Sequence, residues 1–64
     1  MTSERKIEVV RVIVERAAIN GGDICEAHDF ADYTLNLSDG DMMDVLCDPM
    51  CEVLYSLLRV EAKH

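Results

Sequence analysis

The sequence predicts a small all-α domain of three to four helices that pairs into a homodimer. Charged side chains recur at helical spacing in the first third of the chain, and residues typical of helix caps precede each later apolar segment. A chain of 64 residues buries only about 60% of the surface that its unfolded form exposes. We therefore expect a second chain, or a metal ion, to support the small core.

The first helix is predicted over residues 3–19. Its many Val and Ile residues would permit a strand, but its charges recur at i, i+4, i+7 and i+11 and so share one helical face. These charged residues are Glu4, Glu8, Arg11 and Glu15. The sequence Asn20-Gly21-Gly22 is expected to end the helix, because Asn and Gly tolerate a positive φ.

Three further helices are predicted over residues 24–36, 39–47 and 49–61. Asp23 begins a capping-box pattern with Glu26, and Ser38 is an N-cap residue followed by acids in the first turn. Asp48 and Pro49 are typical of an N-cap residue followed by the first residue of a helix. The alternative is that Pro49 only kinks one longer helix. The last helix is expected to bury Met50, Val53, Leu54, Leu57 and Leu58. No repeat or linker divides the chain, so residues 1–64 are predicted to form one domain.

The segment 3–19 carries more apolar surface than one small core requires. Its apolar side chains cover about half of the helix circumference, whereas a helix lying on a core needs only a stripe. One explanation is that this helix is central in its own domain. The small size of the chain favours another, a second copy packed against Ile7, Val10, Ile13, Val14 and Ala17.

The distribution of charge is the most informative feature of the sequence. The chain has 13 acidic and 6 basic residues, a net charge of −7, and no Lys or Arg lies between Arg16 and Arg59. Nine carboxylates lie in that stretch, and six of them form two rows at helical spacing: Glu26, Asp29 and Asp32, then Asp41, Asp44 and Asp48. Neighbouring like charges on a helix destabilise it, so stability alone would favour interleaved lysines.

We expect these six carboxylates to bind a basic surface of a larger protein, since complementary charge speeds encounter and rejects wrong partners. Carboxylate rows can also stand in for DNA phosphates, which lie about 3.4 Å apart along each strand, so that surface can be one that holds nucleic acid. In composition the chain is similar to phage-encoded inhibitors of this kind. Direct nucleic-acid binding is not expected, because the basic patch it requires is absent. The alternatives are acids that serve solubility alone and a module that grips a partner helix with its apolar face.

A zinc-stabilised structural protein is a further alternative. Cys25-x-x-His28 and Cys47-x-x-x-Cys51 supply a Cys₃His set, which zinc binds tetrahedrally. Neither half has the usual CxxC spacing, and Pro49 interrupts the second pair. Cysteine is also among the residue types most often buried. The sequence therefore predicts neither a metal nor another cofactor.

An enzyme is not expected either. The sequence has two histidines, His28 and His64, and neither a glycine-rich phosphate loop nor a nucleophile motif.

The segment after Met1 lacks the basic-then-apolar order of a signal peptide, and no apolar run is long enough to span a membrane. Three cysteines cannot all pair within one chain. We therefore expect reduced thiols and a cytoplasmic location.

Overall fold

The computed structural model describes the backbone of residues 1–62 and the side chains of residues 1–59. The described chain forms four helices and contains no strand: α1 (Ser3–Ile19), α2 (Ile24–Leu35), α3 (Asp39–Leu46) and α4 (Pro49–Ala62). The prediction of an all-α fold is confirmed. Compared with the predicted bounds, α2 and α3 end one residue earlier and α4 ends one residue later.

Side-chain caps define where all four helices begin, and Thr2 caps α1 by accepting from the backbone N–H of Arg5 at 3.1 Å. Asp23 accepts a hydrogen bond from the backbone N–H of Glu26 at 3.1 Å, which satisfies one of the unpaired donors of the first turn of α2. At the start of α3, Ser38 and Asp41 form the reciprocal bonds of a capping box. Asp48 accepts from the N–H of Met50 at 2.9 Å at the start of α4. These local bonds explain why the helices begin where the sequence predicts.

The turn between α1 and α2 depends on its two glycines. Gly21 has a φ of 78° and Gly22 a φ of 93°, which most side chains avoid because of Cβ clashes. The N–H of Gly22 donates to the carbonyl of Ala17, which closes the end of α1. The chain thus reverses within a few residues, and α2 returns along α1.

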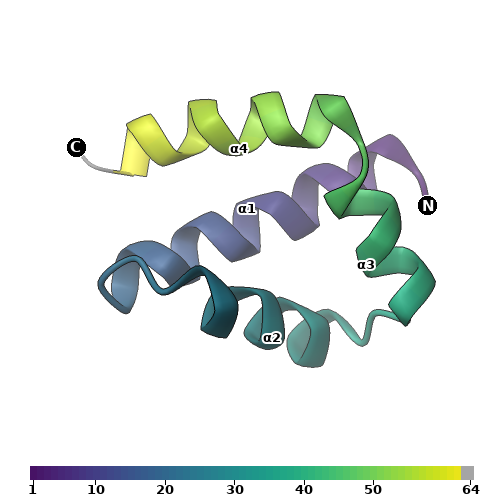
Figure 1. The fold of residues 1–64 in the computed structure, drawn as a ribbon, viewed down its shortest axis with the longest axis horizontal. Coiled ribbons are helices and arrows are strands. Elements are labelled where there is room, and N and C mark those ends of the chain that lie inside the picture. The colour runs from purple at the N-terminus through teal and green to yellow at the C-terminus, as the bar shows by residue number, and fades with distance from the viewer. Residues whose placement is uncertain (63–64) are drawn as a thin grey trace.

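The central helix is α1, with α2 on one side and α4 on the other (Figure 1). Arg5 at the start of α1 donates to the carbonyl of Leu35 at the end of α2, at 2.8 Å. Lys6 bonds Asp48 at the start of α4, at 2.8 Å. Therefore α2 runs antiparallel to α1, whereas α4 runs in the same general direction. The short α3 joins the ends of α2 and α4 (Figure 1), which have little direct contact with each other.

The core lies along α1 and contains few large side chains. Its buried residues are Val9, Val10, Ile13, Val14, Ala17, Ala27, Ala31, Val45 and Cys51. Because α1 packs against helices on two sides, its wide apolar arc is covered within one chain. Four of the five residues expected at a dimer seam, Val10, Ile13, Val14 and Ala17, are therefore at most 7% exposed. Of that set only Ile7, 42% exposed, reaches solvent.

Within residues 1–62, no helix has both the length and the apolar character needed to cross a lipid bilayer.

Candidate protein-interaction surface

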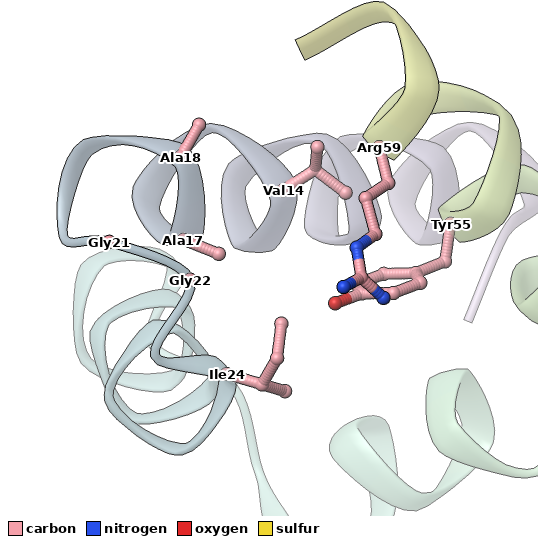
Figure 2. A pocket seen from close by; sticks show the side chains of 8 residues that line it. All are labelled: Val14, Ala17, Ala18, Gly21, Gly22, Ile24, Tyr55 and Arg59. Atoms are coloured by element: carbon pink, nitrogen blue, oxygen red, sulfur yellow. The ribbon is translucent and has the colours of Figure 1, made fainter. Parts of the chain in front are cut away.

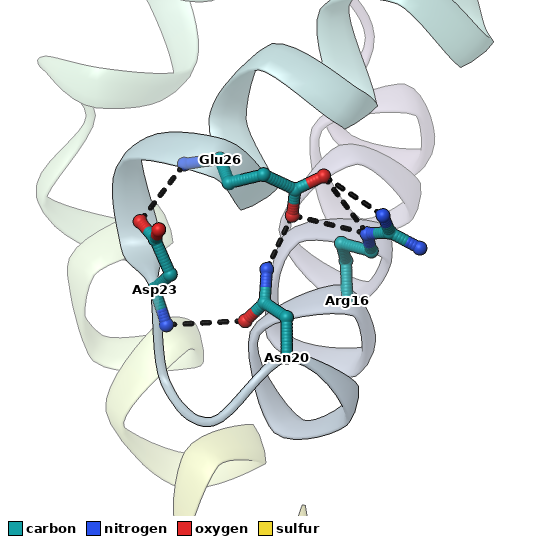
Figure 3. A network of polar contacts seen from close by, with 4 residues as sticks. All are labelled: Arg16, Asn20, Asp23 and Glu26. Atoms are coloured by element: carbon teal, nitrogen blue, oxygen red, sulfur yellow. Dashed lines mark hydrogen bonds and ion pairs between the residues drawn. The ribbon is translucent and has the colours of Figure 1, made fainter.

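Glu26, the first residue of the predicted acidic rows, is paired within its own chain. The Arg16 guanidinium on α1 bonds both carboxylate oxygens, with Nη2–Oε1 2.9 Å and Nε–Oε2 3.0 Å (Figure 3). The side-chain N–H of Asn20 donates to the same carboxylate, and the side-chain oxygen Oδ1 of Asn20 accepts from the backbone N–H of Asp23. The hydrogen bonds from Arg16 hold the pKa of Glu26 below its ordinary value. Glu26 therefore links α1 to α2, and its side chain does not complete a capping box.

Asp48, the last residue of the rows, is also paired within the chain. Its carboxylate accepts from Lys6 Nζ at 2.8 Å and from the N–H of Met50. The bond from Lys6 lowers the pKa of Asp48, and the same bond raises the pKa of Lys6. Only 24% of each of the two charged side chains is exposed. Asp48 thus fastens the start of α4 to α1 and caps α4.

The other four acids of the rows differ in what they contact. Asp41 accepts from the N–H of Ser38 at 3.2 Å as part of the α3 cap. Asp44 lies 3.6 Å from the amino group of Met1, and 53% of its side chain is exposed.

Among the described residues, no ion pair joins Asp29 or Asp32 to a cation, and Asp29 is exposed. Of the six carboxylates expected to bind a partner's basic surface, Glu26 and Asp48 instead pair with cations of their own chain. The reason is geometric, because α2 and α4 both pack beside the cations of α1.

Three apolar residues of α4 that are predicted to be buried in the core lie instead at the surface. Met50, Val53 and Leu57 are 72%, 56% and 62% exposed. Their i, i+3, i+7 spacing places them on one side of α4, and we call these three residues the α4 stripe. Leu54 and Leu58 of the same helix are only half-buried against the core. Because α4 has neighbours on one side only, the rest of its wide apolar arc faces solvent.

The charged residues that the α3 segment and the first half of α4 contribute are all of one sign, although Lys6 of α1 pairs with Asp48 at the start of α4. Every charged residue of the α3 segment and of the first half of α4 is acidic: Asp39, Asp41, Asp44, Asp48 and Glu52. Two more large apolar side chains of α3, Met43 and Leu46, are 56% and 54% exposed. The α3–α4 face therefore combines exposed apolar side chains with carboxylates. The width of the apolar arc in residues 50–58 is the sequence signal that could have revealed this face.

The residues of the zinc alternative are not assembled. Cys25 and Cys47 are exposed, while Cys51 is buried, and its burial raises the pKa of the thiol. Cys25 and His28 belong to α2, whereas the other two lie where α3 meets α4. In the part of the chain that the structure describes, no three or more His, Cys, Asp or Glu residues are grouped to hold a metal ion.

Comparison with known protein families, with curated proteins and with solved structures finds no match for this chain. A functional assignment must therefore rest on these surfaces and their chemistry.

Proposed function

We propose that this protein is a non-enzymatic interaction module, a small inhibitor or regulator that docks its α3–α4 face onto a basic surface of a larger protein. The observation that carries the proposal is the α4 stripe, which is exposed beside a segment whose charges are all negative. Exposed apolar residues grouped on one face are typical of protein-binding sites.

The two parts of this face have different roles in binding. Apolar side chains at i, i+3 and i+7 are the anchors with which a helix enters a groove of its partner. Met50 adds a flexible, polarisable side chain that adapts to an irregular groove. The carboxylates of Asp44 and Glu52 attract a basic surface and exclude acidic ones. The α4 stripe thus provides affinity, and the carboxylates provide a rapid and selective encounter.

The same charges disfavour a second copy of the chain as the occupant of this face, because two such faces would bring like charges together. A homodimer, which the length of the chain predicts, would use another surface. Ile7 and Ile19 are exposed on α1, at 42% and 77%. Sedimentation measurements over a range of protein concentrations check that prediction.

The proposed partner surface is one that ordinarily holds DNA or RNA. Asp44 of α3 supports this choice, because neither Arg nor Lys of its own chain pairs with it among the described residues. Asp29 and Asp32, which the same ion pairs also leave without Arg or Lys, lie on α2 and not on the α3–α4 face. Such carboxylates can meet the cations that otherwise contact phosphates. The acids paired with Arg16 and Lys6, Glu26 and Asp48, are left out of this proposed contact surface.

A defined probe tests the docking face: a synthetic amphipathic helix of Leu and Lys, compared with the same helix in which Glu replaces every Lys. We expect the Leu–Lys peptide to bind and the Leu–Glu peptide not to bind, measured by calorimetry. The double variant Val53→Ser/Leu57→Ser should bind at least about tenfold more weakly. Ile19→Ser, which removes an even more exposed apolar side chain from α1, should bind as the unchanged protein does.

Salt and charge variants complete this test. Binding should weaken as ionic strength rises, because exposed charges are screened, and Asp44→Asn/Glu52→Gln should reduce the salt dependence. Glu15→Gln, an exposed acid of α1, is the matched control. Equal binding of the Leu–Lys peptide to the stripe variant and to Ile19→Ser would exclude the α4 stripe as the docking site. Binding that is unaffected by salt would exclude the role of the carboxylates.

A further inference from the structure

Two adjoining cavities lie between α2 and α4 above the surface of α1. The first has a volume of about 390 Å³ and is lined by Val14, Ala17, Ala18, Ile24, Tyr55 and Arg59, together with the two glycines of the turn (Figure 2). The second, of about 250 Å³, extends toward Val45 and Cys51. Ile24 and Tyr55 line both cavities, which therefore adjoin, and we call the two cavities together the cleft. The cleft exists because α2 and α4 each pack against α1 but have little contact with each other.

The lining of the cleft is apolar apart from a few polar groups at its two ends. Among the described residues that line the first cavity, Arg59 is the only charged one, and its guanidinium points from α4 toward the cavity, which the Tyr55 side chain also lines (Figure 2). Among the described side chains, no carboxylate lies within ion-pair distance of Arg59. Glu52 and His28 lie on the second cavity. One end thus presents a cation and a hydroxyl, and the other presents an acid.

We infer that this cleft binds a medium-chain fatty acid, with the carboxylate against Arg59 and the alkyl chain along α1. Guanidinium and carboxylate form charge-assisted hydrogen bonds in a planar, two-point geometry, and the Tyr55 hydroxyl can donate a further one. The alkyl chain would lie over Val14 and Ile13, where it displaces water from apolar surface. A few polar groups that fix the orientation of a mostly apolar ligand are typical of small-molecule sites.

The charges of the cleft also set the direction in which the ligand lies. A carboxylate near Glu52 would be repelled, whereas one near Arg59 is attracted, and in a chain of net charge −7 this cation is the first after Arg16. The modest size of the two cavities favours a medium over a long alkyl chain. None of the three α4 stripe residues lines either cavity, whereas Leu46 and Glu52 of the α3–α4 face line the second one. The site is therefore separate from the α4 stripe and borders the proposed docking face at its acidic end.

Decanoate, titrated below its micelle concentration into ¹⁵N-labelled protein, is the probe. We expect saturable shifts of the backbone amides that line the cleft, such as those of Gly22, Ile24 and Tyr55. Decan-1-ol, which has the same chain without the charge, should bind about tenfold more weakly. Acetate, which has the charge without the chain, should cause no saturable shift.

Two variants locate the site. Arg59→Gln should weaken decanoate binding by about tenfold or more, whereas Arg11→Gln, an equal loss of charge at an exposed residue of α1 outside both cavities, should leave it unchanged. Ala18→Leu, a substitution at an exposed position, should also weaken binding by filling part of the first cavity. The inference is overturned if decan-1-ol binds as tightly as decanoate, if Arg59→Gln and Arg11→Gln bind equally, or if the shifted amides lie outside the cleft.

Discussion

Arg16 on α1 and Glu26 on α2 form a two-point ion pair across the turn that joins their helices, with Nη2 of Arg16 2.9 Å from Oε1 of Glu26 (Figure 3). The guanidinium carbon of Arg16 also lies 4.4 Å from the ring centre of Phe30, in a cation–π contact. Asn20 bonds the same carboxylate from the end of α1. The two glycines between the helices lose much conformational freedom on folding, and this network holds the turn closed.

Glu26→Gln should destabilise the fold. Glutamine keeps the shape of the side chain but loses the charge that binds Arg16, so the midpoint of urea unfolding should fall. Asp29→Asn is the matched control, since it removes one negative charge from the same helix at an exposed position that forms no ion pair with the described side chains. Because Asp29 belongs to an acidic row, its substitution removes repulsion between neighbouring carboxylates. The urea unfolding midpoint of Asp29→Asn should therefore stay unchanged or rise slightly. Equal decreases in both variants would show that the ion pair adds nothing specific.

The contribution of Glu26 to the stability of the fold should depend on pH. Its folded-state pKa lies below the ordinary value of 4.5, so the stabilisation is complete above 4.5 and is lost as the pH falls through the lowered value. The difference in urea midpoint between the unchanged protein and Glu26→Gln should therefore be largest near neutral pH and narrow on acidification. A difference that persists in strong acid would assign the effect to neutral hydrogen bonds instead of charge.

Substitutions of Asp48 should reduce stability in two steps, because this residue both caps α4 and pairs with Lys6. Asp48→Asn keeps an N-cap residue for the N–H of Met50 but loses the charge that binds Lys6, whereas Asp48→Ala loses both. Unfolding midpoints should decrease from the unchanged protein to the Asn variant and again to the Ala variant. In a Lys6→Gln background the Asn substitution should have little further effect. Additive effects of Lys6→Gln and Asp48→Asn would contradict the pairing.

The positions of the helices could be predicted because their signals are local. Asp23 and Ser38 are N-caps in the structure as in the prediction, and Gly21 and Gly22 both adopt a positive φ. Each of these signals acts within a few residues of the chain, so no knowledge of the packing is needed to interpret it.

The exposed faces could not be predicted in the same way, because they depend on which helix lies in the middle. In the sequence, Val10 and Val14 belong to an apolar surface wider than one small core requires. In the structure, α2 and α4 pack on two sides of α1 and these residues are buried. Met50 and Leu57 looked like core residues, but α4 has a neighbour on only one side. The pairing of Glu26 with a cation ten residues earlier depends on the same arrangement. Helical spacing shows which residues share a face, but it does not show whether that face contacts another helix or solvent.

Ile13 tests how much the small core depends on one side chain. It is 2% exposed and one of the two largest fully buried side chains. Ile13→Val should reduce the free energy of unfolding by about 1 kcal/mol through the loss of one buried methyl group. Ile19→Val, at a side chain 77% exposed on the same helix, should change it by less than about 0.5 kcal/mol. Urea unfolding followed by circular dichroism measures both, and similar losses would place Ile13 outside the core.

The three thiols should differ in reactivity toward iodoacetamide near neutral pH. Cys51 is 5% exposed, and burial raises the pKa of its thiol, so little of the reactive thiolate is present and access to it is poor. Cys25 and Cys47 are exposed and should be alkylated first, as peptide mass spectrometry after a short reaction would show. Cys47, only four residues away, serves as the matched control, and in urea all three should react alike. Equal modification of Cys47 and Cys51 in the folded protein would contradict the packing of the start of α4 against α1.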